Sequence, residues 1–385
     1  MGFVVDRATM EMVCSAQFWR MALLWTLSLL FSYLGLLFPE PLSSLFPSLR
    51  PNPSYPRRGV SLNPSSELER PICVVTGATS GLGAAAAREL AREGYHVVLA
   101  GRSCQLLSET MQKIKQQQSD ACLDAFQVDL SSIHSVVKFE SSLKQWLLDS
   151  NLHPSIQLLI NNAGILAKSC RVTADGFDQM VQTNYIGAFV LTNILLPLLK
   201  NSPVPSRVVN VTSFTHRCVT FSASSVDVSK ETLARKNLCF LPASKPYPFA
   251  WTYEYSKFCL LLLSYELHRQ LYVLDPASSV SVIAADPGVV ETSIMREVPP
   301  RLSRLAFMVL RLLNLLQSPD KGVSSVIDAA LAPPDASGKY FFGGKGRTIR
   351  SSSLSYNSKL AEELWLASSL LFQETQHAVK DSETN

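Results

Sequence analysis

A glycine-rich turn between an apolar segment and a helix-forming segment constrains this chain more than any other feature of its sequence. The apolar run Ile72–Val75 leads into the motif TGATSGLG, and Ala84–Arg92 then favours a helix. Such a loop can hold a phosphate because the first amide groups of the helix point into the turn. Gly77 suits the sharp turn, Gly81 lets the main chain approach a pyrophosphate, and Gly83 permits close contact between helix and strand.

The same pattern also occurs in ordinary strand-to-helix turns, so the rest of the chain has to decide between the two interpretations. Of the 385 residues, 47% are hydrophobic and 17% are charged, which excludes a disordered chain. The net charge is +4, and no block of Lys or Arg indicates nucleic-acid binding. The eight cysteines form no CxxC pair, so we expect no structural metal.

The N-terminal region contains a segment long enough to cross a membrane. Met21–Phe38 has no charged residue, and as a helix it would span about 27 Å, close to the roughly 30 Å hydrocarbon thickness of a bilayer. We expect a transmembrane anchor after a short segment 1–20; a cleaved signal peptide and a transit or interfacial segment are the alternatives. We expect a membrane-anchored protein, most simply of the endoplasmic reticulum, and the flanking arginines favour an orientation with the rest of the chain in the cytosol. These arginines are Arg7, Arg20, Arg50, Arg57 and Arg58.

Residues 39–70 contain seven prolines and show no periodicity, which predicts a linker able to hold a domain off a membrane. From Pro71 onward, apolar strands alternate with helical patterns, and this order predicts an α/β fold with a parallel sheet covered on both faces. The expected strands are 72–75, 96–100, 125–128, 158–160, 207–211 and 279–284. The expected helices are 84–92, 106–117, 133–149, 177–199 and 253–271.

The C-terminal part contains another apolar segment, Leu302–Leu316, which is more apolar than a surface helix needs to be. It covers the core or a dimer contact, or else it lines a lipophilic substrate entrance or dips into a bilayer surface. The sequence therefore leaves open whether the protein forms a homodimer. Residues 351–385 are expected to form a C-terminal helix and a frayed polar tail.

The end of the second expected strand bears on the choice of dinucleotide. An NAD-specific site has a carboxylate here that accepts hydrogen bonds from the ribose, whereas this chain has Gly101 and Arg102. A guanidinium can bind the additional phosphate of NADP, so we expect NADP(H), with a solvated surface arginine as the alternative. Asp129, after the third strand, either contacts the adenine edge or caps a turn.

Tyr253 and Lys257 form the most informative pair of ionisable residues. Four positions apart on a helix, they lie on one face. A tyrosine with its usual pKa of about 10 transfers protons poorly at neutral pH, but a neighbouring ammonium and a cationic ring favour the phenolate. A fall of that pKa to about 7 corresponds to roughly 4 kcal/mol. Tyr255 and Tyr265 lack a lysine at this spacing.

Together these residues carry a resemblance that no single motif would justify. From Pro71 to Tyr340 the chain resembles the short-chain dehydrogenase/reductase family, and it is most similar to the branch of membrane-associated retinol dehydrogenases, WW-domain oxidoreductases and polyprenol dehydrogenases. The matching positions, in the order of the family, are TGxxxGxG at 76–83, NNAG at 161–164, Asn184, Ser213, Tyr253 with Lys257, and Pro287-Gly288. The resemblance implies a single catalytic domain, 71–350, with a Rossmann-type doubly wound parallel sheet, and NADP(H) as cofactor.

The resemblance also implies roles for individual residues. Tyr253 would be the general acid or base toward a carbonyl or alcohol oxygen, and Ser213 would hydrogen-bond that oxygen. Lys257 would hold the nicotinamide ribose and lower the Tyr253 pKa, while Asn184 would anchor a water leading to bulk solvent. The cofactor-binding residues would be Gly77, Thr79, Ser80, Gly81, Leu82, Gly83, Arg102, Asp129, Asn161, Ala163, Tyr253, Lys257, Pro287, Gly288 and Thr292.

The chain departs from the family pattern by an insertion of 39 residues, 214–252, between the serine and the tyrosine. This insertion caps the substrate site or forms a surface loop. We expect an NADP(H)-dependent oxidoreductase that interconverts a carbonyl and an alcohol on a lipophilic substrate, tethered to a membrane by its N-terminal helix. A non-catalytic NADP(H)-binding regulator or scaffold of the same fold is the main alternative, and a sugar-nucleotide epimerase is a weaker one.

Overall fold

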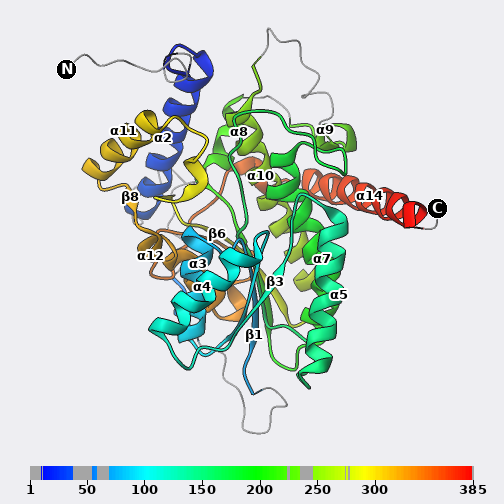
Figure 1. Cartoon of the computed structure of the whole chain (residues 1–385). Helices are drawn as coiled ribbons and strands as arrows, with labels where there is room; N and C mark the ends of the chain where they lie inside the picture. Colours follow the sequence, from blue (N-terminus) through cyan, green and yellow to red (C-terminus); the bar gives the residue numbers. More distant parts are fainter. Residues whose placement is uncertain are drawn as a thin grey trace.

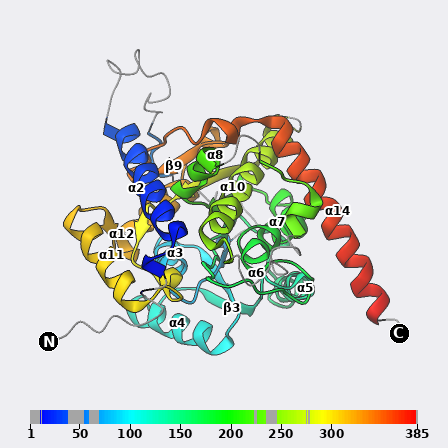
Figure 2. The same ribbon diagram turned by 90° about the horizontal axis from the view of Figure 1, so that it is seen from above.

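The computed structural model describes residues 10, 12–37, 54–58, 69–222, 226–234, 246–273, 275 and 278–383. Its centre is a seven-stranded sheet with helices on both faces (Figure 1). The helix α2 (Ala16–Leu37) lies beside α11 (Pro300–Leu312) at one end of the molecule in both views, and the C-terminal helix α14 (Ser358–Glu383) extends from the opposite side (Figures 1 and 2).

All neighbouring strands of the large sheet are parallel, in the order β3-β2-β1-β4-β5-β6-β9. This is the doubly wound arrangement predicted from the sequence. The order reverses between β1 and β4, and a ligand crevice forms at the carboxyl ends of the strands beside such a reversal. The strands are β1 Ile72–Thr76, β2 His96–Gly101, β3 Leu123–Gln127, β4 Leu158–Asn161, β5 Ser206–Val211, β6 Val280–Asp286 and β9 Tyr340–Phe342. A separate pair joins β7 Val289–Val290 to β8 Leu316–Gln317.

Alternate residues of each strand serve the two faces of the sheet, as the two-residue repeat of a strand requires. In β1, Cys73 and Val75 belong to one apolar cluster, and Ile72 and Val74 belong to the other. The first face is covered by α3 Gly81–Arg92, α4 Cys104–Gln117 and α13 Ser324–Ala330. The second is covered by α5 Ile133–Asp149, α7 Gly187–Lys200 and α10 Phe249–His268, with α14 packed outside them. Shorter helices are α6 Gln179–Val181, α8 Cys218–Ser222, α9 Lys230–Ala234 and α12 Pro319–Gly322.

The helix expected at 177–199 is interrupted by a π-helical turn, η2, at Gln182–Ile186 between α6 and α7. Turns of this kind insert one extra residue into the helix and are frequent at functional sites. Asn184 lies within it. Propensity alone does not reveal such a turn, because its cause is the packing of Asn184 described below.

The N-terminal helix does not stand apart from the domain that contains the large sheet. It begins five residues earlier than the expected start at Met21, and it packs against η3 (Phe214–Arg217) and α10. Among the described residues, two helices have the length and composition of a membrane span. One is Gln179–Lys200, which is a core helix with 78% of its apolar window buried, whereas the window at Ala16–Leu36 is 22% buried.

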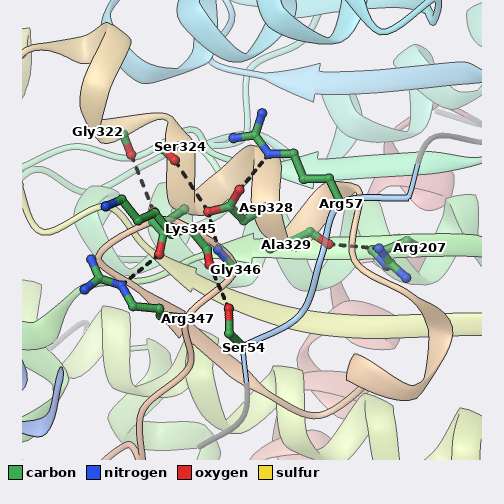
Figure 3. A network of polar contacts seen from close by, with 12 residues as sticks. Ser54, Arg57, Arg207, Gly322, Ser324, Asp328, Ala329, Lys345, Gly346 and Arg347 are labelled. Atoms are coloured by element: carbon green, nitrogen blue, oxygen red, sulfur yellow. Dashed lines mark hydrogen bonds and ion pairs between the residues drawn. The ribbon is translucent and has the colours of Figure 1, made fainter. Parts of the chain in front are cut away.

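Residues 54–58 lie within the segment expected as a linker, and the structure differs from that expectation because they are fastened to the domain. Arg57 Nε donates to Asp328 Oδ1 at 2.7 Å, and the backbone N–H of Gly346 donates to Asp328 Oδ2 at 2.9 Å. Figure 3 shows Arg57, Ser324 and Gly346 converging on Asp328. The Tyr55 N–H donates to the Gly346 carbonyl at 2.9 Å. This attachment keeps the segment close to the domain instead of extending away from it.

The insertion 214–252 contributes η3, α8 and α9, while 223–225 and 235–245 lie outside the described residues. Its first part packs between α2 and α10. Arg217 donates from Nε to Ser32 Oγ at 3.2 Å, and Ser28 Oγ lies 3.2 Å from Cys218 Sγ. This part of the insertion therefore secures the N-terminal helix.

Candidate functional site

The glycine-rich turn has the geometry that phosphate binding requires. Gly77 and Gly81 have φ values of +66° and +53°, which residues with side chains rarely adopt. A Cβ on Gly83 would lie 2.2 Å from the Gly77 carbonyl oxygen, so that position excludes alanine. Ser80 precedes α3 without a side-chain capping bond. The amide groups of the first turn are therefore not capped by that side chain, and the turn fits a dinucleotide pyrophosphate.

The opposite side of this turn is formed by the segment after β6. Thr292 lies so close to Gly81 that a Cβ there would be 3.0 Å from Thr292 Cγ2. Ser80 Oγ and Ser293 Oγ are 3.3 Å apart. Gly288, after Pro287, has φ +71° and donates its N–H to Asp286 Oδ1 at 2.8 Å. The structure thus brings the predicted 287–292 segment to the glycine-rich turn.

Arg102 and Asp129, the two residues expected at the adenosine end of the dinucleotide, differ in their surroundings. Arg102 is exposed directly after β2. A Cβ on Gly101 would lie 3.2 Å from Thr79 Cγ2, so Arg102 stands beside the glycine-rich turn. Asp129 Oδ1 accepts hydrogen bonds from the N–H and the hydroxyl of Ser131, at 2.9 and 2.7 Å. Asp129 therefore caps a turn, which was the alternative interpretation.

Within the NNAG motif, the second asparagine rather than the first contacts the glycine-rich turn. Asn161 donates to Thr192 Oγ1 and to Asn210 Oδ1, both at 2.8 Å, so its side chain is held in the core. Asn162 Nδ2 donates to the Thr76 carbonyl at 2.8 Å. The N–H groups of Asn162 and Ala163 both donate to Thr76 Oγ1. We did not predict Asn162 or Thr76, although both belong to the quoted motifs.

The residues predicted to be catalytic lie together at the carboxyl end of β5. Lys257 Nζ donates to the Val211 carbonyl at 2.9 Å and lies 6.0 Å from the centre of the Tyr253 ring. Thr212 Oγ1 donates to the Lys257 carbonyl at 3.0 Å, which ties α10 to the strand end. The Ser213 side chain acts on the Tyr253 phenol, whose pKa it lowers. The spacing of Tyr253 and Lys257 on α10 therefore brings both side chains to the carboxyl end of β5.

Asn184 holds the loop after β4 against α10. Its Oδ1 accepts from the Ile165 N–H at 2.8 Å, and its Nδ2 donates to the Ile165 carbonyl at 2.9 Å and to Ser256 Oγ at 3.0 Å. A Cβ on Gly164 would be 3.4 Å from both Asn184 Oδ1 and Lys257 Nζ. The Gly164 main chain therefore lies close to both Asn184 and Lys257.

Burial dominates the electrostatics of the site. It raises the pKa of Tyr253, the Asp286 charge raises it further, and the Ser213 hydrogen bond opposes both. Burial lowers the pKa of Lys257 to about 8 and raises that of Asp286 to about 6. With only these protein groups around it, the Tyr253 phenol stays protonated at neutral pH. The structure therefore differs from the expectation that Lys257 lowers the Tyr253 pKa.

The N-terminal helix reaches this site, which the sequence did not indicate. Glu254, next to Tyr253, has 0% exposure. Arg20 Nη2 donates to Glu254 Oε2 at 2.7 Å, and Trp25 Nε1 donates to Glu254 Oε1 at 2.8 Å. The rings of Trp25 and Tyr253 are 5.7 Å apart. In the sequence, the one sign of this contact is Arg20 just before the uncharged segment. We interpreted it only as a charge that flanks a membrane span.

Comparisons with known proteins agree with this architecture. The family model for short chain dehydrogenase matches residues 71–231. Polyprenol dehydrogenase from Homo sapiens is 34% identical over 299 residues, covering 76% of this chain and 82% of that protein. Retinol dehydrogenase 12 from Mus musculus is 31% identical over 297 residues, covering 76% and 84%.

A crystal structure of an uncharacterised protein from Mycobacterium Paratuberculosis superposes with a TM-score of 0.57 at 26% identity, covering 80% of this chain and 95% of that one. The similarity to the two dehydrogenases extends over most of their length. The chain therefore belongs to the short-chain dehydrogenase family of oxidoreductases.

Proposed function

We propose that this protein is an NADP(H)-dependent oxidoreductase that interconverts a carbonyl and an alcohol on a lipophilic substrate. The observation that carries the proposal is the convergence of Ser213, Tyr253 and Lys257 at the carboxyl end of β5. The glycine-rich turn follows β1, which is two strands away from β5 in the same parallel sheet. The names of the two dehydrogenase relatives refer to the apolar alcohols polyprenol and retinol, which supports the substrate class.

A bound nicotinamide supplies or accepts the hydride. The Tyr253 hydroxyl donates a proton to the carbonyl oxygen during reduction and takes it back from the alcohol during oxidation. Ser213 Oγ hydrogen-bonds the same oxygen and holds it against the phenol. Lys257 lies beside the Tyr253 ring, where it would hold the nicotinamide ribose, and burial lowers its pKa to about 8. Asn184 orients the loop that packs on this lysine.

The direct test is a turnover assay with the full chain in detergent or vesicles. NADPH absorbance is followed with a panel of aliphatic, aromatic and isoprenoid aldehydes and ketones. We expect carbonyl-dependent loss of absorbance. NADPH binding without turnover of any compound would favour the non-catalytic regulator or scaffold instead, and the Tyr253 variant described in the Discussion separates enzymatic turnover from background.

We propose NADP(H) rather than NAD(H) because Arg102 is exposed beside the turn and no carboxylate follows β2 at positions 101 or 102. Arg102→Ala should raise the KM for NADPH about 10- to 100-fold and leave that for NADH within about threefold. Hydrogen bonds to charged groups contribute about 1.5–3 kcal/mol, which corresponds to this range. Lys115→Ala, which removes an exposed cation from α4, is the matched control. Equal changes for both cofactors would contradict the assignment.

We also propose that α2 and α11 rest on a membrane, in keeping with an endoplasmic reticulum protein whose domain faces the cytosol. The two helices lie side by side and carry exposed apolar side chains (Figures 1 and 2). On α2 these are Trp19, Leu23, Leu27, Leu30, Phe31 and Leu34; on or just after α11 they are Leu305, Met308, Val309, Leu312 and Leu313. Because the other face of α2 holds polar contacts to the domain, a helix lying in the interface fits better than one crossing the bilayer.

The membrane proposal predicts a change in vesicle flotation. Replacing Leu23, Leu27 and Leu30 with glutamate should lower the fraction that floats with phospholipid vesicles at least tenfold, since each buried leucine contributes about 1.5–3 kcal/mol. Leu366→Glu with Leu370→Glu, which alters exposed leucines of α14, should leave flotation unchanged. Equal flotation of both variants would rule out the α2 face as the membrane contact.

A further inference from the structure

We propose that α2 is a wall of the substrate site and that Trp25 determines the preference for substrates with long apolar groups. This inference rests on the proposed oxidoreductase function and assigns a specificity residue to it. The sequence suggested the insertion 214–252 as a substrate cap, whereas the structure brings the N-terminal helix against Tyr253.

On the side of Tyr253 that faces α2, apolar residues come together from widely separated parts of the chain. The Trp25 ring lies 5.7 Å from that of Tyr253, at an interplanar angle of 42°. Tyr253 itself is 7% exposed. The cluster around it includes Met12, Met21, Ile165, Leu166, Met180 and Phe249. A substrate carbonyl that reaches the phenol must therefore place its neighbouring atoms among apolar side chains.

Trp25 is held in place by two kinds of contact. Its indole N–H donates to Glu254 Oε1 at 2.8 Å, and Arg20 pairs with the same carboxylate at 2.7 Å. Glu254 is the neighbour of Tyr253 in α10, so the position of Trp25 is set by the helix that carries the phenol. Two turns further along α2, Ser32 Oγ accepts from Arg217 Nε at 3.2 Å. These bonds make α2 a fixed part of the site.

The same helix joins the site to the exposed apolar surface. Trp25 and Met21 face the domain, while Leu23 and Leu27 of the neighbouring positions are exposed. Leu302 of α11 packs on the cluster that contains Met21 and Tyr253. The apolar side chains of α2 and α11 thus extend from Tyr253 to the outer surface, and we assign to them the contact with an apolar chain attached to the carbonyl carbon. A polar group in the same place would lose its water without gaining a partner.

The test is a series of straight-chain aldehydes from about four to about sixteen carbons, assayed with NADPH and the full chain. We expect kcat/KM to rise with chain length in the wild type. Trp25→Ala should lower kcat/KM at least tenfold for the longest aldehydes and less than threefold for the shortest, with NADPH affinity unchanged. Trp25→Phe keeps an aromatic ring but loses the indole donor. Its kcat/KM for the longest aldehydes should lie between those of the wild type and of Trp25→Ala. Thr26→Ala, on the exposed side of α2, is the control.

Two results would overturn the assignment: an equal loss for short and long aldehydes, or no loss for either. Circular dichroism identifies a variant that fails to fold, and in that case the Trp25→Phe selectivity decides. If the wild type turns over no carbonyl, the proposed function fails and this inference fails with it. If the wild type is active and neither Trp25 variant changes the selectivity, only this inference fails.

Discussion

Replacing Tyr253 with phenylalanine should lower kcat for carbonyl reduction about 100- to 10,000-fold, the usual contribution of a positioned acid or base. The substitution removes one hydroxyl and keeps the ring that packs on Trp25. Because the ring and its neighbours stay in place, the dissociation constant for NADPH should change less than about threefold. The measurement is NADPH oxidation at saturating carbonyl, together with a fluorescence titration of NADPH.

Tyr255→Phe is the matched control, since it removes a hydroxyl from the same helix. That hydroxyl donates to the Asp227 carbonyl at 3.0 Å and takes no part in the proposed site. Its kcat should stay within about threefold of the wild type. If Tyr253→Phe keeps more than a tenth of the activity, the phenol is not the proton donor and the proposed mechanism is wrong.

Arg20→Met should destabilise the protein by about 3 kcal/mol, although Arg20 is far in sequence from the catalytic domain. The substitution leaves the carboxylate of Glu254 in a site with 0% exposure and without its cation, and unpaired buried charges typically cost about 3–5 kcal/mol. We take the lower end because Arg20 is 31% exposed. The midpoint of thermal unfolding should fall by roughly 4–5 °C, because the entropy of unfolding of a chain this long is large.

Two further variants identify the cause of that loss. Glu254→Gln combined with Arg20→Met should recover most of the stability, because the neutral amide needs no cation. Arg311→Met breaks an ion pair with Glu291 of the same length, 2.7 Å, on the surface, and it should cost less than about 1 kcal/mol. Equal losses in Arg20→Met and Arg311→Met would refute the argument.

The Arg20 effect should also depend on pH in a defined direction. Burial raises the pKa of Glu254, and the hydrogen bond and charge of Arg20 oppose that rise. Without Arg20 the pKa rises further, so the carboxyl group takes up a proton at a higher pH in the folded state than in the unfolded chain. The cost of the unpaired charge is present above the folded pKa and disappears as the pH falls through it. Arg20→Met should therefore approach the wild type in stability under acidic conditions.

The parts of the fold that were predictable depend on local pattern. The apolar strands, the glycine-rich turn and the spacing of Tyr253 and Lys257 are each contained in a few consecutive residues. The ends of some elements were less accurate, since β3 starts at Leu123 rather than at 125. Strand β9, Tyr340–Phe342, was missed because three residues carry too little pattern to identify a strand.

The parts that were not predictable depend on contacts between distant residues. The uncharged segment at 21–38 is apolar on all sides, so its periodicity does not reveal which face packs on the domain. The position of Trp25 depends on Glu254, more than 200 residues away. The pKa of Tyr253 likewise depends on burial and on Asp286, which meets it only through the fold. The spacing of Tyr253 and Lys257 identified the phenol from the sequence. The direction in which its pKa is shifted could be found only from the structure.

The attachment of α2 has a consequence for the biosynthesis of the protein. Gly35 lies next to Ile349, and the ring of Tyr33 packs on that of Phe342 at 5.1 Å. Ribosomes add about 5–20 residues per second, so these partners are made about 15–60 s after the helix. During that interval the nascent chain carries an apolar helix whose later neighbours do not yet exist. A lipid surface or a chaperone must shield it until the last strand of the sheet has been translated.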